Sequence, residues 1–365
     1  MEGREYEALA KAVVRKALRI RGGEGVVVEC WNHGLDVAKE IVFQLRSLGA
    51  RPMLLLEDEE TYWRSVESLP TTMLGQVSRS EWAALERADA YIFIPGPADL
   101  ARYRKNMPKS QAATAYNTEW YRRAEKAKLR AVRLLLGYVT RERAAAYGFD
   151  YDAWRSMILE ASTTDYAAIA RRGRKLKTLL SKQAEVEISA PNGTHLTFEL
   201  DGRAAKLDDG ITDASDVREG EFMSNVPPGS AYVAPAESSA EGTFVSDRPE
   251  AYLGSLINGV RFEFRGGHVS WSSDSSPASD RIRASFDAAK GPKDRIGGIN
   301  IGLNPAVRYG YLQDDLVAGA CQVWIGSNTD EGGRNRTNFS LSAKLSQATV
   351  RVGRKRVVDT GRLAV

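Results

Sequence analysis

The sequence is poor in the residues that build metal sites and disulfides. Its 365 residues include only three histidines, His33, His195 and His268, and two cysteines. No His-x-x-His, His-Glu-x-x-His or His-x-Asp pattern occurs, so the short histidine motifs of zinc hydrolases are absent. Cys30 and Cys321 are far apart in the sequence. Two such cysteines exclude a disulfide framework and a cysteine-rich zinc site.

The sequence also lacks a strong charge bias and long apolar runs. Lys and Arg number 51 against 47 Asp and Glu, which gives a formal net charge of +4. No basic block is interleaved with aromatic residues, so we predict no nucleic-acid partner. No apolar run is long enough to span a bilayer, and residues 1–5 lack the apolar core of a signal peptide. These absences predict a cytoplasmic protein that does not contact membranes.

The first half of the chain alternates between strand and helix patterns. Predicted strands lie at residues 26–28, 53–56, 90–94 and 134–136, and predicted helices at 4–20, 35–48 and 82–88. This alternation is typical of a parallel sheet covered by helices. His33 follows the first strand, where open α/β sheets often bind ligands. Without a GxGxxG motif there, we interpret His33 as a structural cap of the strand end.

The second half is rich in β-hairpin patterns. Residues 186–200, 260–271 and 350–358 each alternate around a glycine-containing turn, and residues 280–289 predict one helix. Residues 151–180 predict a mostly helical link. The fold class is therefore α/β, an N-terminal open parallel sheet with helices plus a C-terminal β-rich α+β domain. We place the domains at residues 1–165 and 166–365.

A turn-rich stretch, residues 219–249, stands near the middle of the second half. Its Asn225-Val226-Pro227-Pro228-Gly229 run predicts a tight, non-helical bend, because two prolines fix φ and remove two backbone donors. Short strands are predicted at residues 231–233 and 243–245. The pattern alone is that of an ordinary loop in a β domain.

The residue order of this stretch resembles the signature of the aminopeptidase T family of dinuclear metalloaminopeptidases. That family has an Asn-Leu-Pro-x-Gly-Glu turn, an Ala-Pro segment and a Glu-Gly pair. The matching residues are 225–229, Ala234-Pro235 and Glu241-Gly242. Segments 297–305, 319–326 and 335–342 are similar to three further family segments and occur in the family's order. The resemblance implies that the second domain carries a former metal site.

The resemblance also implies that the metal ligands have been replaced. The positions of two Glu, two His, one Tyr and one Asp of the family carry Ser230, Gly298, Gln322, Thr329, Ser340 and Ser342. None of these residues is anionic, whereas a two-metal hydrolytic site needs carboxylates and imidazoles. We therefore predict that the protein uses no metal and no other cofactor.

The matched segments define a candidate cavity without assigned acid or base roles. Arg334 and Arg336 precede the replaced His-x-Asp and suit bidentate binding of a peptide carboxylate. Asn300 stands where the family has glycine. The nearby carboxylates are general-base candidates or ordinary surface and turn residues: Glu237, Glu241, Asp247, Asp314 and Asp315. The predicted cavity residues are Ser230, Glu241, Gly298, Asn300, Gln322, Thr329, Arg334, Arg336, Ser340 and Ser342.

Three functional hypotheses follow from these residues and the resemblance. The first is a metal-independent peptide-modifying protein, a peptide cyclase similar to the metal-free relatives in crocagin-type ribosomal-peptide biosynthesis. The second is a non-catalytic peptide-binding pseudoenzyme or partner subunit. The third is a metal-dependent aminopeptidase. The resemblance implies a peptide as substrate or ligand, and a homodimer around an internal cavity.

Overall fold

The computed structural model describes residues 5–252 and 254–365. Residues 1–4, which hold most of the charged N-terminus and the start of the first predicted helix, lie outside the described residues. The chain forms two compact units. Unit 1 contains the described residues up to Tyr166 together with Gly210–Pro227, and unit 2 contains Ala167–Asp209 and Pro228–Val365.

Unit 1 is built on a five-stranded parallel sheet, here sheet A, with the order β2-β1-β3-β4-β8. Its strands are β1 Gly25–Trp31, β2 Arg51–Glu57, β3 Ala90–Ile94, β4 Arg130–Leu134 and β8 Met223–Val226. The first three strands confirm the prediction. The fourth begins at Arg130, four residues before the predicted 134–136. Arg130 donates to the Leu18 carbonyl and pairs with Glu24, so a charged residue obscures the apolar pattern of this strand.

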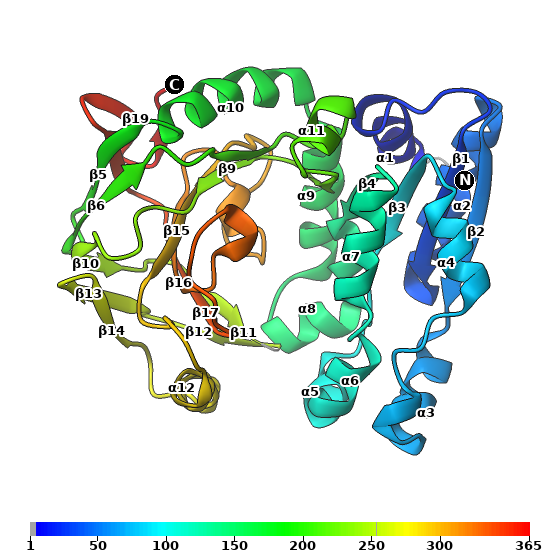
Figure 1. Cartoon of the computed structure of the whole chain (residues 1–365), viewed down its shortest axis with the longest axis horizontal. Coiled ribbons are helices and arrows are strands. Elements are labelled where there is room, and N and C mark those ends of the chain that lie inside the picture. The colour runs from blue at the N-terminus through cyan, green and yellow to red at the C-terminus, as the bar shows by residue number, and fades with distance from the viewer. Residues whose placement is uncertain (1–4, 253) are drawn as a thin grey trace. The chain divides into compact units, whose positions relative to one another are not determined.

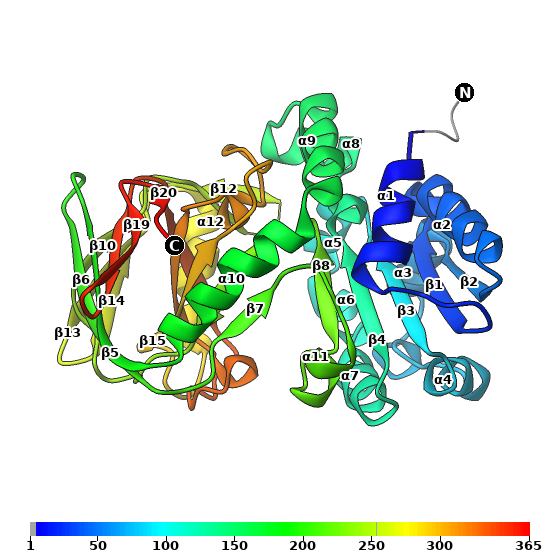
Figure 2. The same ribbon diagram turned by 90° about the horizontal axis from the view of Figure 1, so that it is seen from above.

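Helices lie on both faces of sheet A (Figure 1 and Figure 2). Helices α4 (Arg79–Glu86) and α7 (Asn117–Lys126) pack on the face that carries Val27 and Tyr91. The predicted helix at 35–48 is α2 (Leu35–Ser47), and the first is α1 (Glu7–Lys11), continued by a π-helical turn at Ala12–Ala17. The remaining helices of the unit are α3 Glu59–Ser68, α5 Leu100–Lys105, α6 Met107–Ala113, α8 Arg141–Tyr147, α9 Tyr151–Thr163 and α11 Ala214–Arg218.

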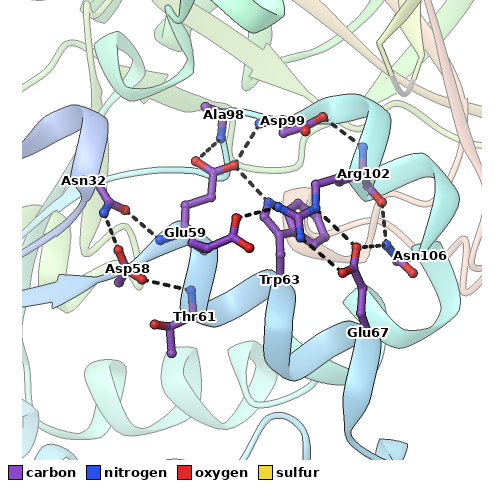
Figure 3. Close-up of polar contacts among 11 residues, drawn as sticks. Asn32, Asp58, Glu59, Thr61, Trp63, Glu67, Ala98, Asp99, Arg102 and Asn106 are labelled. Carbon is purple, nitrogen blue, oxygen red and sulfur yellow. Dashed lines mark hydrogen bonds and ion pairs between the residues drawn. The ribbon is translucent and has the colours of Figure 1, made fainter.

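Polar side chains tie together the loops at the carboxyl ends of β1, β2 and β3 (Figure 3). Asn32 donates to Asp58, which caps α3 by accepting from the Thr61 amide. The carboxylate of Glu59 accepts the backbone amides of Ala98 and Asp99 at 3.0 and 2.9 Å. These groups resemble a ligand site in composition, but each is occupied by the protein's own backbone or side chains.

His33 belongs to the same set of loop contacts. Its Nε2 lies 3.2 Å from the Pro95 carbonyl and 2.9 Å from the Gly137 carbonyl. The Trp31 indole covers Gly96, where a Cβ would meet the ring at 2.4 Å. The position where open α/β sheets usually bind ligands is thus packed by the chain itself, and His33 holds two loops together.

Unit 2 contains two larger antiparallel sheets and a two-stranded one. Sheet B has the order β14-β13-β10-β6-β5-β18-β19-β20, sheet C the order β17-β16-β15-β9-β7, and β11 pairs with β12. Apolar residues of both larger sheets, such as Val186 and Phe198 of sheet B and Ile299 and Val323 of sheet C, form one core cluster with Leu176. The three predicted hairpins are confirmed as β5–β6, β13–β14 and β18–β19.

The bounds of the unit 2 elements follow. Sheet B contains β5 Gln183–Ala190, β6 Thr194–Asp201, β10 Glu241–Val245, β13 Arg261–Arg265, β14 His268–Ser272, β18 Thr349–Val352, β19 Lys355–Asp359 and β20 Arg362–Leu363. Sheet C contains β7 Lys206–Asp208, β9 Ser230–Val233, β15 Ile296–Gly302, β16 Cys321–Gly326 and β17 Ser340–Leu345. The others are β11 Glu250–Tyr252, β12 Ser255–Ile257, α10 Tyr166–Leu180 and the predicted helix, α12 Pro277–Ala288.

The predicted bend at residues 225–229 is confirmed only at residues 227–229, because Asn225 and Val226 belong to strand β8. Strand β8 ends at Val226 and β9 begins at Ser230, so the chain passes here from unit 1 to unit 2. Gly229 has φ +130°, and a Cβ on it would lie 2.7 Å from the Cβ of Asn304. Asn304 in turn donates to the Pro228 carbonyl at 2.7 Å. Two segments of the family resemblance therefore hold each other, and the turn requires glycine.

No helix in residues 5–252 and 254–365 combines the length and the apolar character needed to cross a lipid bilayer.

Candidate functional site

Sheet C has one apolar face and one polar face. Ala231, Ile299, Ile301, Val323 and Ala343 point into the core cluster of unit 2. Because side chains alternate along a strand, the residues between them lie on the opposite face, which we call the outer face of sheet C. Its residues are Lys206, Asp208, Ser230, Tyr232, Gly298, Asn300, Gly302, Gln322, Trp324, Gly326, Ser340, Ser342 and Lys344.

The outer face brings together six of the ten predicted cavity residues. The strand register aligns Asn300 with Gln322. One row further, Gly298 lies opposite Trp324, and Trp324 lies opposite Ser342. The six residues are Ser230, Gly298, Asn300, Gln322, Ser340 and Ser342. Figure 1 shows their strands β9, β15, β16 and β17 together in unit 2.

Trp324 fills the space beside the glycines of β15. A Cβ at Gly298 would lie 2.1 Å from the indole Cη2, and a Cβ at Gly297 would lie 2.3 Å from the indole Cδ1. The ring is 9% exposed, and its Nε1 donates to the Ser327 carbonyl at 3.1 Å. A longer side chain at position 298, such as the family's glutamate, does not fit while the indole stands there.

A buried lysine ends the row that begins with Asn300 and Gln322. Lys344 lies opposite Gln322 on β17 and is only 5% exposed. Its Nζ pairs with Glu250 Oε2 at 2.9 Å. Burial alone lowers the pKa of Lys344, but Glu250 and Asp315 raise it above its ordinary value. Lys344 therefore stays an ammonium ion at neutral pH.

Burial makes the ionised form of the carboxylates around Lys344 less favourable. Burial raises the pKa of Glu250, Asp314 and Asp315, while the Lys344 ammonium works in the opposite direction on all three. Asp314 Oδ1 accepts the backbone amides of Gly310 and Tyr311 at 2.7 and 3.0 Å. The charged groups thus depend on one another, and the lysine is the cation that faces all three carboxylates.

Some buried polar atoms of this region have no hydrogen-bond partner among the described residues. They are Asn300 Oδ1, Asp314 Oδ2 and the Tyr309 hydroxyl. Asn300 nevertheless donates its Nδ2 to the Asp315 carbonyl at 3.1 Å, which places its amide beside the acidic segment. Such atoms are expected to bind water or a ligand. Within the described ranges, no three His, Cys, Asp or Glu side chains are arranged to hold a metal ion.

Three other predicted cavity residues lie on the loop between β16 and β17. Thr329, Arg334 and Arg336 are exposed. The loop is fixed from inside by two buried asparagines: Asn328 donates to the Gly297 carbonyl at 3.1 Å, and Asn335 donates to the Ile296 carbonyl at 3.0 Å. The structure places the two arginines on a loop held by these hydrogen bonds, with both residues exposed.

Glu237 connects this loop to the Ala-Pro segment. Its carboxylate accepts both terminal guanidinium nitrogens of Arg203, at 2.6 and 2.9 Å, and the Arg334 backbone amide at 2.6 Å. Burial alone raises the pKa of Glu237, but these hydrogen bonds outweigh it and hold the pKa at about 2. Glu237, a general-base candidate from the sequence, is therefore an ionised structural residue.

Replacing Glu237 by Gln is expected to destabilise the protein by about 2 kcal/mol at neutral pH, since charge-assisted hydrogen bonds are lost. The wild-type pKa is depressed, so this stabilisation is complete above the unfolded value of 4.5 and disappears as the pH falls toward about 2. Urea denaturation of both proteins at several pH values measures the difference. A constant difference across that range would contradict the assignment.

Glu241 lies apart from the other predicted residues. It begins β10 in sheet B, is exposed, and accepts the Gly266 backbone amide at 2.6 Å. Its neighbour Gly242 has φ +106°, and a Cβ there would lie 2.2 Å from the His195 carbonyl oxygen. The Glu-Gly pair of the resemblance thus supports strand pairing in sheet B.

The sequence reasoning missed Lys344, Glu250 and Trp324. Lys344 interrupts a strand whose core-facing residues Leu341, Ala343 and Leu345 are buried, and a lysine two residues after the replaced His-x-Asp was the available signal. Asp314 and Asp315 were considered, but their partner is distant in sequence. Trp324 gave no signal of its role, because its contact with Gly298 exists only across the sheet.

Comparison with known proteins relates the chain to one protein family. The family model described as thermophilic metalloprotease (M29) matches residues 3–279. A search of curated protein sequences finds no match. Three of the four resembling segments, those from Gly297 onward, lie after the matched range.

Two solved structures are similar over their lengths. Wild-type AmpT from Thermus thermophilus has a TM-score of 0.76 and 18% identity, with 100% of both chains covered. The 2,5-dihydroxypyridine dioxygenase from Pseudomonas putida has a TM-score of 0.63 and 16% identity, with 100% of this chain and 97% of that chain covered. At these identities the likeness shows the fold alone. Since the family model matches well over half of the chain, the protein belongs to the thermophilic metalloprotease (M29) family.

Proposed function

We propose that this family member binds a peptide on the outer face of sheet C without using a metal ion. The observation that carries the proposal is the position of Trp324 against Gly297 and Gly298, where an added Cβ would lie 2.3 and 2.1 Å from the indole. The family description names a metalloprotease, so the residues present must be tested against a metal site.

The residues on the outer face do not fit a two-cation site. Such a site needs several carboxylates and imidazoles within reach of both ions. The positions that the resemblance assigns to ligands carry hydroxyls, an amide and a glycine, and the indole takes up the space next to that glycine. The buried cation of this face is the Lys344 ammonium, which is already paired with Glu250.

Neutral polar groups suit a peptide as the bound molecule. Hydroxyls and amides both donate and accept hydrogen bonds, as the backbone of a peptide requires. Ser342 and Gln322 are half-buried, and Ser340 is exposed. The family description names a protease, which supplies the general substrate class, and the outer face carries groups that can hold a peptide chain.

A second candidate function is metal-independent modification of the peptide, with cyclisation as its form. The Lys344 cluster favours it, because cyclisation requires a folded substrate and a proton transfer. The charged side chains of this cluster are Glu250, Asp314, Asp315 and Lys344. Peptide binding without modification remains the first proposal, because Lys344 is engaged in a buried ion pair.

The test combines metal analysis with peptide binding by the purified full-length protein. A pool of synthetic peptides is presented, retained peptides are identified by mass spectrometry, and Gln322→Ala is compared with the exposed control Gln347→Ala. If peptide retention is lost in Gln322→Ala and kept in the control, the result supports peptide binding on the outer face. A product lighter by one water, or of equal mass with altered fragmentation, supports modification. Stoichiometric zinc, manganese or cobalt with release of N-terminal residues would overturn both proposals. Light scattering of the same sample tests the homodimer.

A further inference from the structure

We propose that the side of sheet A at which its parallel strands begin is a binding site for an acidic peptide segment. This proposal is independent of the function proposed for sheet C. A cavity of about 640 Å³ lies within unit 1, within the usual size range of ligand sites. Its walls come from the segments that precede β1, β3, β4 and β8. This is the edge opposite to the carboxyl ends where parallel sheets usually bind ligands.

Cationic side chains outnumber acidic ones in this cavity. Its lining includes Arg19, Arg21, Lys128, Arg130 and Arg218, against three acids. Such a concentration is unexpected in a chain whose net charge is only +4. A concave surface with an excess of one sign of charge attracts a ligand of the opposite sign.

The acidic residues of the cavity are engaged by the protein itself. Glu24 accepts from the Arg130 guanidinium and from the Arg21 backbone amide, both at 2.9 Å. Asp89 accepts the Gly25 amide at 2.8 Å, and Asp213 caps α11 by accepting the Ser215 amide at 2.8 Å. These carboxylates are therefore largely satisfied by groups other than the remaining cations.

Three cations are left for a ligand. Arg21, Lys128 and Arg218 are exposed, and within residues 5–252 and 254–365 their side chains form no ion pair. Arg19 reaches Asp213 only at 3.6 Å. The free charges come from three separate segments of the chain, as expected of a surface that binds an extended anion.

Backbone strain coincides with this cavity. Arg19 and Lys128 have φ of +48° and +54°, and among the described residues the only other non-glycine residue with positive φ is Thr360. A non-glycine residue in this region costs about 1 kcal/mol, and such strain is concentrated at functional positions. Glycine would remove the strain at either position but would also remove a cationic side chain from the wall.

The geometry favours spaced carboxylates over other anions. The N-terminus of α11, where a phosphate would be bound by backbone amides, is already capped by the Asp213 carboxylate. No aromatic residue lines the cavity, so the stacking surface that single-stranded nucleic acids require is missing. Separate, flexible cations suit an extended peptide with several Asp or Glu side chains.

Fluorescence anisotropy of the full-length protein tests the site. The probe is a labelled peptide of alternating Glu and Gly, with the Gln-Gly peptide as neutral counterpart. We expect binding of the acidic probe that weakens as salt is raised. The triple variant R21E/K128E/R218E is expected to weaken it by about 30-fold or more, which is about 2 kcal/mol. The matched control R171E/R172E/K175E changes the same charge on exposed residues of α10 and should leave most of the affinity.

Each alternative outcome has a clear meaning. Equal loss in both triple variants, or equal binding of the neutral peptide, would overturn the site. Displacement of the probe by inorganic phosphate at low concentration would indicate a compact oxyanion instead. Tighter binding of a single-stranded oligonucleotide that the R21E/K128E/R218E variant abolishes would indicate nucleic acid. The milder variant K128Q/R218Q, with an unchanged melting temperature, separates lost binding from lost folding, and failure of the sheet C proposal affects none of these results.

Discussion

Replacing Gly298 by Glu is expected to destabilise the protein by about 3 kcal/mol or more, because the new side chain meets the Trp324 ring and brings an unpaired charge into a buried strand. The new Cβ would lie 2.1 Å from the indole, so strand or ring must shift. Urea denaturation measures the change in unfolding free energy. The control Ser340→Glu places the same side chain at an exposed position of β17 and should change stability by no more than about 0.5 kcal/mol.

The double variant Gly298→Glu/Trp324→Ala distinguishes steric exclusion from general intolerance. Trp324→Ala alone is expected to cost about 3 kcal/mol, since a large buried ring is removed. If the ring is what excludes the glutamate, the double variant loses at least about 1 kcal/mol less than the sum of the single losses. Strict additivity, or a Gly298→Glu protein as stable as wild type, would contradict the role given to Trp324.

Replacing Lys344 by Met is expected to destabilise the protein by about 3–5 kcal/mol at neutral pH, because breaking a buried ion pair leaves its carboxylates without a cation. Burial already raises the pKa of Glu250 and Asp315, and loss of the ammonium raises both further. A folded carboxyl with a raised pKa binds protons that the unfolded chain does not, so the deficit shrinks as the pH is lowered from neutral toward the ordinary carboxyl pKa.

Two further variants define the result for Lys344. Lys344→Met/Glu250→Gln removes both partners of the pair and should recover part of the loss, since fewer charges remain buried. Lys355→Met on β19 is the control, because Lys355 is exposed, and its effect should be within about 0.5 kcal/mol. A Lys344→Met deficit that is independent of pH would show that the lysine contributes packing instead of charge.

The sequence was informative where local pattern and burial agree. The hairpins β5–β6, β13–β14 and β18–β19 have alternating apolar residues and glycine turns, and each was located correctly. Strand β8 was not predicted, because its four residues include Ser224 and Asn225 and because it pairs with β4, whose residues lie 92 positions earlier in the chain. Short polar strands of this kind are formed by their partner and carry little pattern of their own.

The site was only partly accessible from the sequence for a similar reason. The family order put Asn300 and Gln322 in one candidate cavity, and in the structure they are cross-strand neighbours in sheet C. Glu241 was matched by the same order but lies in sheet B. The contact of Trp324 with Gly298 and the pairing of Lys344 with Glu250 depend on distances across the fold, which no local spacing encodes.

The position of β8 also constrains the order in which the protein can fold during synthesis. The last strand of unit 1 is Met223–Val226, and the segments of β5, β6 and β7 of unit 2 precede it in the chain. A nascent chain that ends anywhere before this strand exposes the edge of β4, and unpaired edges promote aggregation. The N-terminal unit therefore cannot be completed on the ribosome before its successor has begun, in contrast to the domain-by-domain order of most two-domain proteins.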